Sequence, residues 1–286
     1  MSDYIIYADS SCDIDKETLK KWNVNFFELT FMFDGSDKQY RNFDLAANEF
    51  YTIIRSGMQA KTSAINTSVY YDAFKKCAEQ GQDVMYIAFS SGLSSTYQNA
   101  CIAANDVLEE YPGRKIVVVD SLCASAGYGM LLHKAVGKRD EGLSLDENAD
   151  YINELKYRIN SWFTVDDLKY LRKGGRIGVA AAKVANKIGI KPVLHMDDEG
   201  HLVYRYMVRG KKAAFKALLE EYAQRAKMGE EVFISHGDNM EAVNKLSELF
   251  KELFGVSFTY VADVGPVIGG HTGPGVVSIF FEGAGR

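Results

Sequence analysis

The sequence predicts an α/β fold in two parts: an N-terminal domain built as a parallel-sheet α/β/α sandwich, and a C-terminal α/β domain with a mixed sheet. Three observations support this prediction. Before residue 140, apolar runs, polar loops and amphipathic helices alternate three times, an order typical of parallel strands with right-handed crossovers. Around 191–208 two apolar segments flank a tight turn, which is typical of antiparallel strands. The length of 286 residues also suffices for two moderate domains.

In the first part, short apolar runs predict strands, and segments with apolar residues at helical spacing predict helices. Asp15 and Asp44 are expected to cap the helices that follow them, since a carboxylate accepts hydrogen bonds from free N–H groups of a first turn. Several strands end in serine-rich loops, which a parallel sheet gathers at its carboxyl edge, where ligands bind. The predicted strands are 4–8, 25–33, 84–89 and 116–119, and the predicted helices are about 16–21, 44–55, 70–78, 97–108, 128–136 and 147–159.

The second part is expected to form a mixed sheet with helices on one face. The sequence contains no internal repeats and no long linker, so the two domains, 1–160 and 161–286, are expected to pack tightly against each other. The predicted strands of this part are 162–165, 191–196, 201–208, 232–235, 258–264 and 276–281, and its helices are about 211–227 and 240–254.

Composition excludes several classes of protein. A net charge of −5 and a pI near 5.6 argue against nucleic acid as a main partner. No apolar run approaches the length of ~20 residues that crosses a bilayer. Residues 1–4 lack the basic-then-apolar pattern of a leader peptide. The four cysteines show no C-x-x-C spacing, and reduced thiols in the cytoplasm are therefore expected.

Motif searches exclude further chemistry. The sequence has no G-x-G-x-x-G after a strand, no phosphate-binding G-x-x-x-x-G-K-[ST] and no H-E-x-x-H. The five histidines are scattered and the cysteines do not cluster, so no metal site is expected. No serine lies in a G-x-S-x-G elbow, which disfavours a serine hydrolase of that kind.

Two polar segments indicate an anion-binding site. The stretch 90–96 has five hydroxyl residues in seven, directly before a predicted helix. A helix N-cap needs one hydroxyl, and surplus donors at a helix N-terminus suit a carboxylate or phosphate. The stretch 269–275, Gly-Gly-His-Thr-Gly-Pro-Gly, is expected to be a tight turn that presents His271 and Thr272 as donors. Neutral donors suit a monoanion that must also leave.

Six segments of the chain resemble the signature segments of the DegV family, in the expected order and over essentially the whole length. One small departure lies in the third of them, where the family often has Ser-Gly-Thr-Tyr and this sequence has Ser95 in place of the glycine. The segments are Asp9-Ser-Ser-Cys-Asp13, Lys61-Thr-Ser63, Ser90-Ser-Gly-Leu-Ser-Ser-Thr-Tyr-Gln98, Lys173-Gly-Gly-Arg-Ile177, Lys191-Pro192 and Gly269–Gly275.

The resemblance implies a protein that binds one long-chain fatty acid, such as palmitate, without a cofactor or metal. It further implies the binding subunit of bacterial fatty acid kinase, which is not itself an enzyme. Such a subunit presents the carboxylate to a separate ATP-dependent kinase and receives an acyl phosphate for phospholipid synthesis. The resemblance also allows transient contact of such a subunit with the membrane. Carried over to this sequence, the carboxylate-binding residues are Thr62, Ser63, Ser94, Ser95 and His271, and Arg176 is the candidate for meeting the kinase.

The residues also leave an alternative open. Ser94 or Ser95 paired with His271 would make an esterase or acyl transferase that acts on lipids, and burst kinetics with an activated ester would reveal it. For a carrier, in contrast, a bound carboxylate is expected to favour the imidazolium form of His271 and so raise its pKa.

Overall fold

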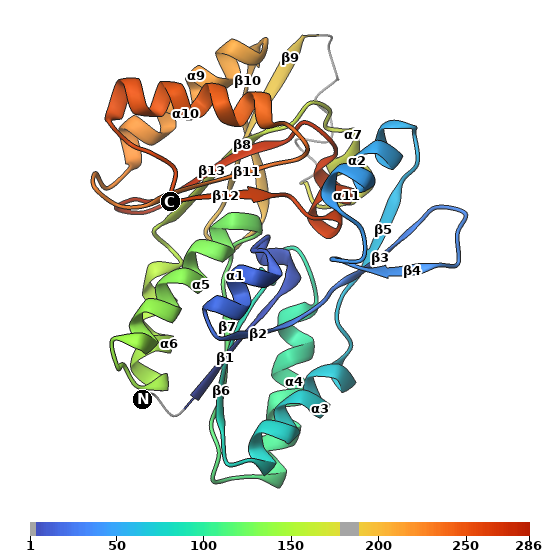
Figure 1. The fold of residues 1–286 in the computed structure, drawn as a ribbon, viewed down its shortest axis with the longest axis vertical. Helices are drawn as coiled ribbons and strands as arrows, with labels where there is room; N and C mark the ends of the chain where they lie inside the picture. The colour runs from blue at the N-terminus through green and yellow to red at the C-terminus, as the bar shows by residue number, and fades with distance from the viewer. Residues whose placement is uncertain (1–3, 178–188) are drawn as a thin grey trace.

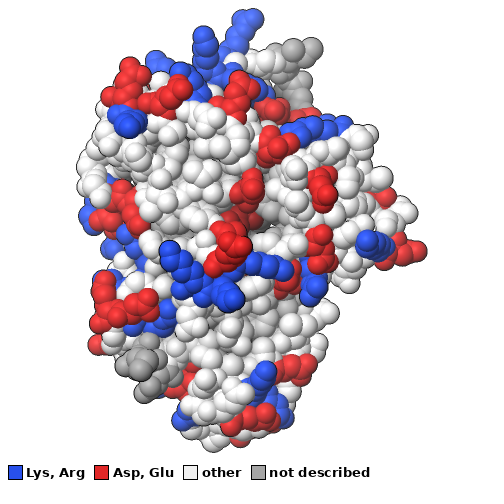
Figure 2. Space-filling view, in the orientation of Figure 1, with Lys and Arg blue, Asp and Glu red and all other residues white. Residues whose placement is uncertain are grey.

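A computed structural model describes residues 4–177 and 189–286 of the chain. Residues 1–3, which entered the leader-peptide argument, lie outside these ranges. The chain forms two halves, each built of a sheet with helices, which pack against each other. A small third sheet lies beside their junction (Figure 1). Acidic and basic side chains are intermingled on the face seen in Figure 2, as the small net charge of −5 would lead one to expect.

The first half is built on a four-stranded sheet in the order β2-β1-β6-β7, and all its pairings are parallel, as predicted. Successive side chains of a strand point to opposite faces. On β6, accordingly, Met85 and Ile87 enter one core while Val84 and Tyr86 enter the other. A sheet with apolar residues on both faces needs a helical layer on each. The strands are β1 (Tyr4–Asp9), β2 (Val24–Phe27), β6 (Asp83–Ala88) and β7 (Ile116–Asp120).

Helices supply these two layers. The predicted cap of α1 is confirmed, because Asp15 accepts from the N–H of Thr18 at 2.8 Å. Helix α6 begins earlier than predicted, because Ser144 and Glu147 form a reciprocal capping box. Helices α5 and α6 pack on one face of the sheet, and α3 and α4 on the other. The helical segments are η1 (Ser10–Cys12), α1 (Lys16–Lys21), α3 (Thr67–Glu79), α4 (Thr96–Glu110), α5 (Ser125–Asp140) and α6 (Leu145–Leu155).

The third sheet corrects the prediction of a single strand at 25–33. The segment divides at Leu29, whose N–H donates to Ser10 Oγ at 3.0 Å and so leaves the strand ladder. After this break the chain enters a small antiparallel sheet in the order β4-β3-β5. The predicted cap at Asp44 is also wrong, because this carboxylate accepts from the N–H of Arg41 instead. The elements are β3 (Thr30–Phe33), β4 (Gln39–Arg41), β5 (Ala60–Ser63) and α2 (Ala47–Arg55).

The second half contains the expected mixed sheet, in the order β10-β9-β8-β13-β11-β12. Among the described strands of this sheet, β11 and β12 pair in parallel, and the other strand pairings are antiparallel. Helices α9 and α10 cover one face, as predicted, while α5 of the first half packs against the other. The elements are β8 (Ile159–Thr164), α7 (Lys169–Lys173), β9 (Ile190–Met196), β10 (Leu202–Arg209), α9 (Lys211–Arg225), β11 (Val232–His236), α10 (Met240–Phe254), β12 (Tyr260–Asp263), α11 (Pro266–Thr272) and β13 (Val277–Glu282).

The prediction of a turn over 269–275 is wrong in its first half. Residues up to Thr272 belong to helix α11, and only Gly273 and Gly275 adopt the left-handed conformation, with φ of 75° and 83°. Gly269 serves a different purpose from a turn. A β-carbon there would lie 2.6 Å from the hydroxyl oxygen of Tyr51, so glycine lets α11 approach α2 closely.

Among the described residues, no helix is both long and apolar enough to cross a membrane.

Candidate functional site

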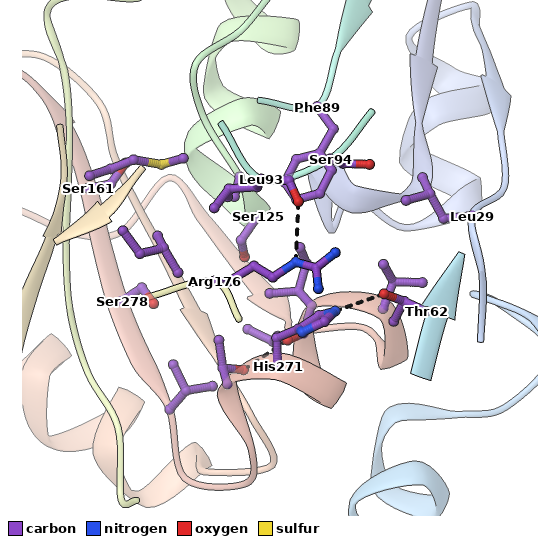
Figure 3. A pocket seen from close by; sticks show the side chains of 18 of the residues that line it. Leu29, Thr62, Phe89, Leu93, Ser94, Ser125, Ser161, Arg176, His271 and Ser278 are labelled. Carbon is purple, nitrogen blue, oxygen red and sulfur yellow. Dashed lines mark hydrogen bonds between the residues drawn. The ribbon is translucent and has the colours of Figure 1, made fainter. Parts of the chain in front are cut away.

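An apolar cavity of about 210 Å³ lies where the three sheets meet. Its walls come from the loops after β6 and β7, from one face of β8 and β13, and from β5 and α11. Most of the lining is aliphatic or aromatic, and it includes Leu29, Phe89, Leu93, Phe163 and Phe280. Figure 3 shows Leu29, Phe89 and Leu93 beside polar side chains of the same cavity. A largely apolar cavity with few polar groups is typical of a small-molecule site.

Thr62 and His271 meet at one side of the cavity. Thr62 is on β5, His271 is in the last turn of α11, and Thr62 Oγ1 lies 2.8 Å from His271 Nε2 (Figure 3). Burial, and secondarily the positive charge of Arg176, lowers the pKa of His271 to about 4. The imidazole is therefore neutral at neutral pH in the ligand-free protein. The imidazolium expected from the sequence would need a bound carboxylate to stabilise it.

The other ring nitrogen of His271 has an unusual environment. Nδ1 is buried and has no hydrogen-bond partner among the described residues. It faces Gly174, where a β-carbon would lie only 2.2 Å away. Since the φ of Gly174 is −70°, the backbone there does not require glycine. Glycine at this position therefore makes room for the imidazole ring.

Three further hydroxyls predicted for the site, those of Ser63, Ser94 and Ser95, line the same cavity. Ser95 is the N-cap residue of α4, yet its side chain makes no capping hydrogen bond. Ser94 Oγ lies 2.8 Å from Thr96 Oγ1. No hydrogen bond joins Ser94 or Ser95 to His271, whose Nε2 is paired with Thr62. The geometry therefore provides donors at a helix N-terminus but not the serine–histidine pair of the esterase alternative.

Arg176 is part of the cavity wall. Its Nε donates to the carbonyl of Leu93 at 3.3 Å, and its Nη1 donates to the carbonyl of Gly174. The bond to Leu93 links the loop after α7 to the serine-rich loop of the first half, and the bond to Gly174 lies within the loop after α7. The sequence-based expectation of neutral donors alone is therefore incomplete, because a guanidinium also lines the cavity.

A second, more polar cleft of about 410 Å³ adjoins the first cavity. Thr62, Arg176 and His271 line both spaces. They consequently form the boundary between the apolar cavity and the cleft. The other residues of the cleft include Lys61, Lys169, Lys173, Asp34 and Met58.

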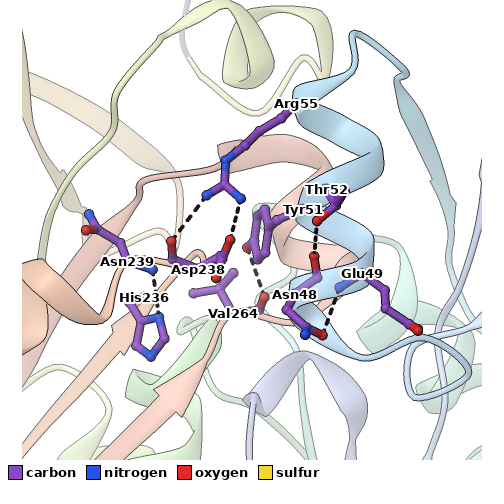
Figure 4. A network of polar contacts seen from close by, with 9 residues as sticks. All are labelled: Asn48, Glu49, Tyr51, Thr52, Arg55, His236, Asp238, Asn239 and Val264. Carbon is purple, nitrogen blue, oxygen red and sulfur yellow. Dashed lines mark hydrogen bonds and ion pairs between the residues drawn. The ribbon is translucent and has the colours of Figure 1, made fainter.

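Contacts between α2 and the second half hold this boundary in place (Figure 4). Arg55 forms an ion pair with Asp238, after β11, and its Nη2 also donates to the Asp238 carbonyl at 3.2 Å. Tyr51 donates to the carbonyl of Val264 at 2.9 Å, just before α11. The small sheet that carries Thr62 is thereby fixed to the half that carries His271.

The acidic motif at 9–13 forms hydrogen bonds with the segments that surround the cavity. Asp9 is buried and accepts from the N–H of Phe89 at 3.0 Å and from the hydroxyl of Tyr86 at 2.8 Å. Asp13 accepts from Ser125 Oγ at 2.5 Å and from the N–H of Gly265 at 3.0 Å, and burial raises its pKa to about 7. These carboxyl groups tie cavity-forming loops together without lining the cavity.

Sequence reasoning missed the residues of the cavity interior and the role of Gly174. The alternation of side chains along a strand was a usable signal for the interior. Ser161 and Phe163 share one face of β8, and Ser278 and Phe280 share the same face on β13. The sequence did not reveal which face would meet a ligand. Within residues 4–177 and 189–286, no group of three or more His, Cys, Asp or Glu side chains is arranged to hold a metal ion.

The fold and site define a class: an α/β protein with an apolar cavity at the junction of its halves and a polar boundary at one side. A sequence model for the DegV family of uncharacterised proteins matches residues 4–284. The chain is 34% identical to a DegV domain-containing protein of Clostridium perfringens, over 99% of this chain and 98% of the relative. It is 37% identical to the DegV domain-containing protein YteA of Lactococcus lactis, over 96% of each. The chain belongs to the DegV family.

Solved structures agree with this assignment. A DegV family protein from Thermus thermophilus, described as binding fatty acid, superimposes with a TM-score of 0.87 at 27% identity, covering 98% of this chain and 99% of that one. A stearic acid-binding protein from Eubacterium ventriosum gives a TM-score of 0.84 at 28% identity, with 97% and 98% coverage.

Proposed function

We propose that this chain binds one long-chain fatty acid, with the tail in the apolar cavity and the carboxylate at Thr62 and His271. The observation that carries the proposal is the cavity itself, which has largely apolar walls and the hydrogen-bonded pair of Thr62 and His271 at one side. The serines at positions 63, 94 and 95 would complete the carboxylate-binding set, helped by the partial positive charge of the α4 N-terminus. The fatty-acid ligands of the structural relatives support the same assignment.

Burial of the tail would supply most of the affinity. A saturated chain of ~16 carbons, such as palmitate, gains ~0.8 kcal/mol per buried CH₂, so ~10 kcal/mol is an upper bound for the tail. Association costs at least ~4 kcal/mol of lost translational and rotational freedom. The remainder, together with the carboxylate hydrogen bonds, favours a ligand that binds tightly and leaves slowly.

We infer that the protein is a carrier without chemistry of its own, and that it presents the carboxylate in the cytoplasm to a separate ATP-dependent kinase, which forms the acyl phosphate. The position of Thr62 and His271 at the boundary of the polar cleft supports this idea, because a partner could reach a carboxylate there without opening the apolar cavity. The absence of a serine–histidine pair among the described residues of the site favours a carrier over an esterase.

Lipid analysis tests the binding proposal. Protein purified without added lipid should yield fatty acid in an organic extract examined by mass spectrometry, at about one molecule per chain. Delipidated protein should take up palmitate again. If native and delipidated protein give the same empty extract, and neither takes up palmitate, the carrier assignment fails.

Kinase assays test the proposed docking role of Arg176. Arg176→Ala is expected to keep its fatty acid but to raise the apparent KM of the kinase for the carrier. The relative defect should shrink at high salt, where the unaltered protein loses the same electrostatic steering. Unchanged kinetics at both ionic strengths would leave Arg176 as a link between the loop after α7 and Leu93 only.

A further inference from the structure

The interior of the cavity contains hydroxyl groups that a plain acyl chain does not satisfy. Ser161 on β8 is only 3% exposed, and its Oγ is buried without a hydrogen-bond partner among the described residues. Ser278 on β13 also lines the cavity, and none of the described residues forms a hydrogen bond with its hydroxyl. In Figure 3 both serines lie across the cavity from Thr62, with Arg176 between. They therefore line a part of the cavity that is distant from a carboxylate at Thr62.

The strand register brings the two serines together. In the antiparallel pair β8–β13, Ser161 lies opposite Phe280 and Phe163 lies opposite Ser278. Ser161 and Ser278 are therefore diagonal neighbours on one face, and such positions lie about 7 Å apart. Ser161 Oγ lies against α5, 3.0 Å from where a β-carbon of Gly127 would be. Rotation about the Cα–Cβ bond of Ser161 would turn this hydroxyl toward Ser278, so that one ligand oxygen between them could bond to both.

A third serine of the cavity wall contrasts with these two free hydroxyls. Ser125, at the start of α5, also lines the cavity, but it donates to Asp13 at 2.5 Å and lies 3.0 Å from the hydroxyl of Ser235. Its hydrogen-bonding capacity is thus used within the protein. Ser161 and Ser278 have donors and acceptors left over. Buried polar groups in proteins nearly always have partners, so the unused capacity points to a partner that the described part of the chain does not provide.

We propose that Ser161 and Ser278 form a second polar subsite in the cavity and that the preferred ligand is a long-chain fatty acid with a hydroxyl group on its chain. The inference rests on the proposed fatty-acid binding and adds the substrate class. A ligand hydroxyl can accept from one serine and donate to the other. A plain chain would bury both serines against CH₂ groups. Sites built to bond a ligand hydroxyl reject analogues that lack it, because the site's polar groups are then left unpaired.

Competition binding to the delipidated full chain tests the subsite. The probes are stearate and a series of hydroxystearates with the hydroxyl near the carboxylate, in mid-chain or near the methyl end. At least one hydroxystearate should bind about tenfold more tightly than stearate, the ratio expected for one buried hydrogen bond that would otherwise be unmade. If no hydroxystearate exceeds stearate, water satisfies the serines and the subsite is refuted.

Two serine variants distinguish the subsite from a general effect on binding. Ser161→Ala and Ser278→Ala should each weaken binding of the preferred hydroxystearate. Binding of stearate should stay equal or become tighter, so that the preference for the hydroxystearate falls to about threefold or less. Ser63→Ala, which removes a hydroxyl from the carboxylate side, should change both affinities by the same factor. If the ratio of hydroxystearate affinity to stearate affinity is the same in all three variants and in the unaltered protein, the inference is overturned. Failure of every acid to bind would instead contradict the proposed function.

Discussion

The two sides of the cavity differ in how they are built. The boundary facing the polar cleft is assembled from β5, the end of α11 and the loop after α7, parts of the chain that lie far apart in sequence. The interior wall is largely apolar, and part of it comes from neighbouring positions of the paired strands β8 and β13. The difference suggests a division of labour: the interior supplies affinity through burial, while the boundary sets the orientation of the carboxylate.

Filling the interior should have the largest effect on binding. Leu202 on β10 lines the cavity, and Leu202→Trp would occupy part of the space for the tail. Displacing about four CH₂ groups costs about 3 kcal/mol, so fatty-acid affinity should fall about 100-fold. Leu253→Trp, on the exposed face of α10, is the matched control and should bind normally. Equal affinity of the two variants in titration with a fluorescent fatty acid would place the tail elsewhere.

Changes at the boundary should affect phosphoryl transfer more than binding. Thr62→Ala and His271→Ala each remove a hydrogen bond worth about 1 kcal/mol net, so affinity should fall tenfold or less. Misplacing the reacting carboxylate by about 1 Å can slow transfer about 100-fold. Assays of acyl phosphate formation at saturating carrier would measure this, and Thr62→Ser should restore most of the rate. A variant that binds poorly yet transfers normally per bound acid would contradict the division of labour.

Gly174→Ala tests whether the position of the imidazole ring itself matters. The added methyl group would have to displace the His271 ring, since a β-carbon at this position would lie 2.2 Å from Nδ1. We expect transfer to slow about tenfold by this displacement, and the free energy of unfolding to fall by about 1–3 kcal/mol through overpacking. Gly113→Ala is the control, because nothing lies within 4 Å of a β-carbon there. Normal transfer by Gly174→Ala would show that the ring position is not limiting.

The smallest expected effect is on the pH dependence of binding. Without ligand the pKa of His271 is about 4, and a neighbouring carboxylate raises it. Binding therefore takes up a proton between pH 4 and the raised value, and affinity should fall severalfold as pH rises through that window. The His271→Asn variant should lose this part of the pH dependence of affinity. The part that comes from protonation of the fatty acid itself should be the same in the variant and in the unaltered protein. Identical pH profiles in calorimetric titrations would exclude a carboxylate beside the ring.

Much of the fold could be predicted because its strands are continuous apolar runs. The parallel order of the first half and the mixed sheet of the second followed from such runs. The small third sheet did not, because its strands have only three or four residues and, of the three, only β3 has buried positions. Helix α11 was missed because Gly269 and Gly270 favour a turn locally, while close packing against Tyr51 imposes the glycine at 269. The boundary between the domains at 160 and 161 stays a prediction.

The site was predictable in part, and for a different reason. Thr62, Ser94, Ser95 and His271 were named through motif resemblance, and all four line the cavity. Arg176 lines the cavity and also donates hydrogen bonds to two backbone carbonyls. These contacts depend on tertiary structure that the local sequence does not encode. The same holds for the free hydroxyls of the interior.

A structure of the delipidated protein reloaded with stearate would test the central claim most directly. The account predicts one stearate in the apolar cavity, with a carboxylate oxygen in hydrogen-bond range of Thr62 Oγ1 and the tail passing along Phe163 and Phe280. A carboxylate at Ser161 and Ser278, or a stearate bound outside this cavity, would contradict it.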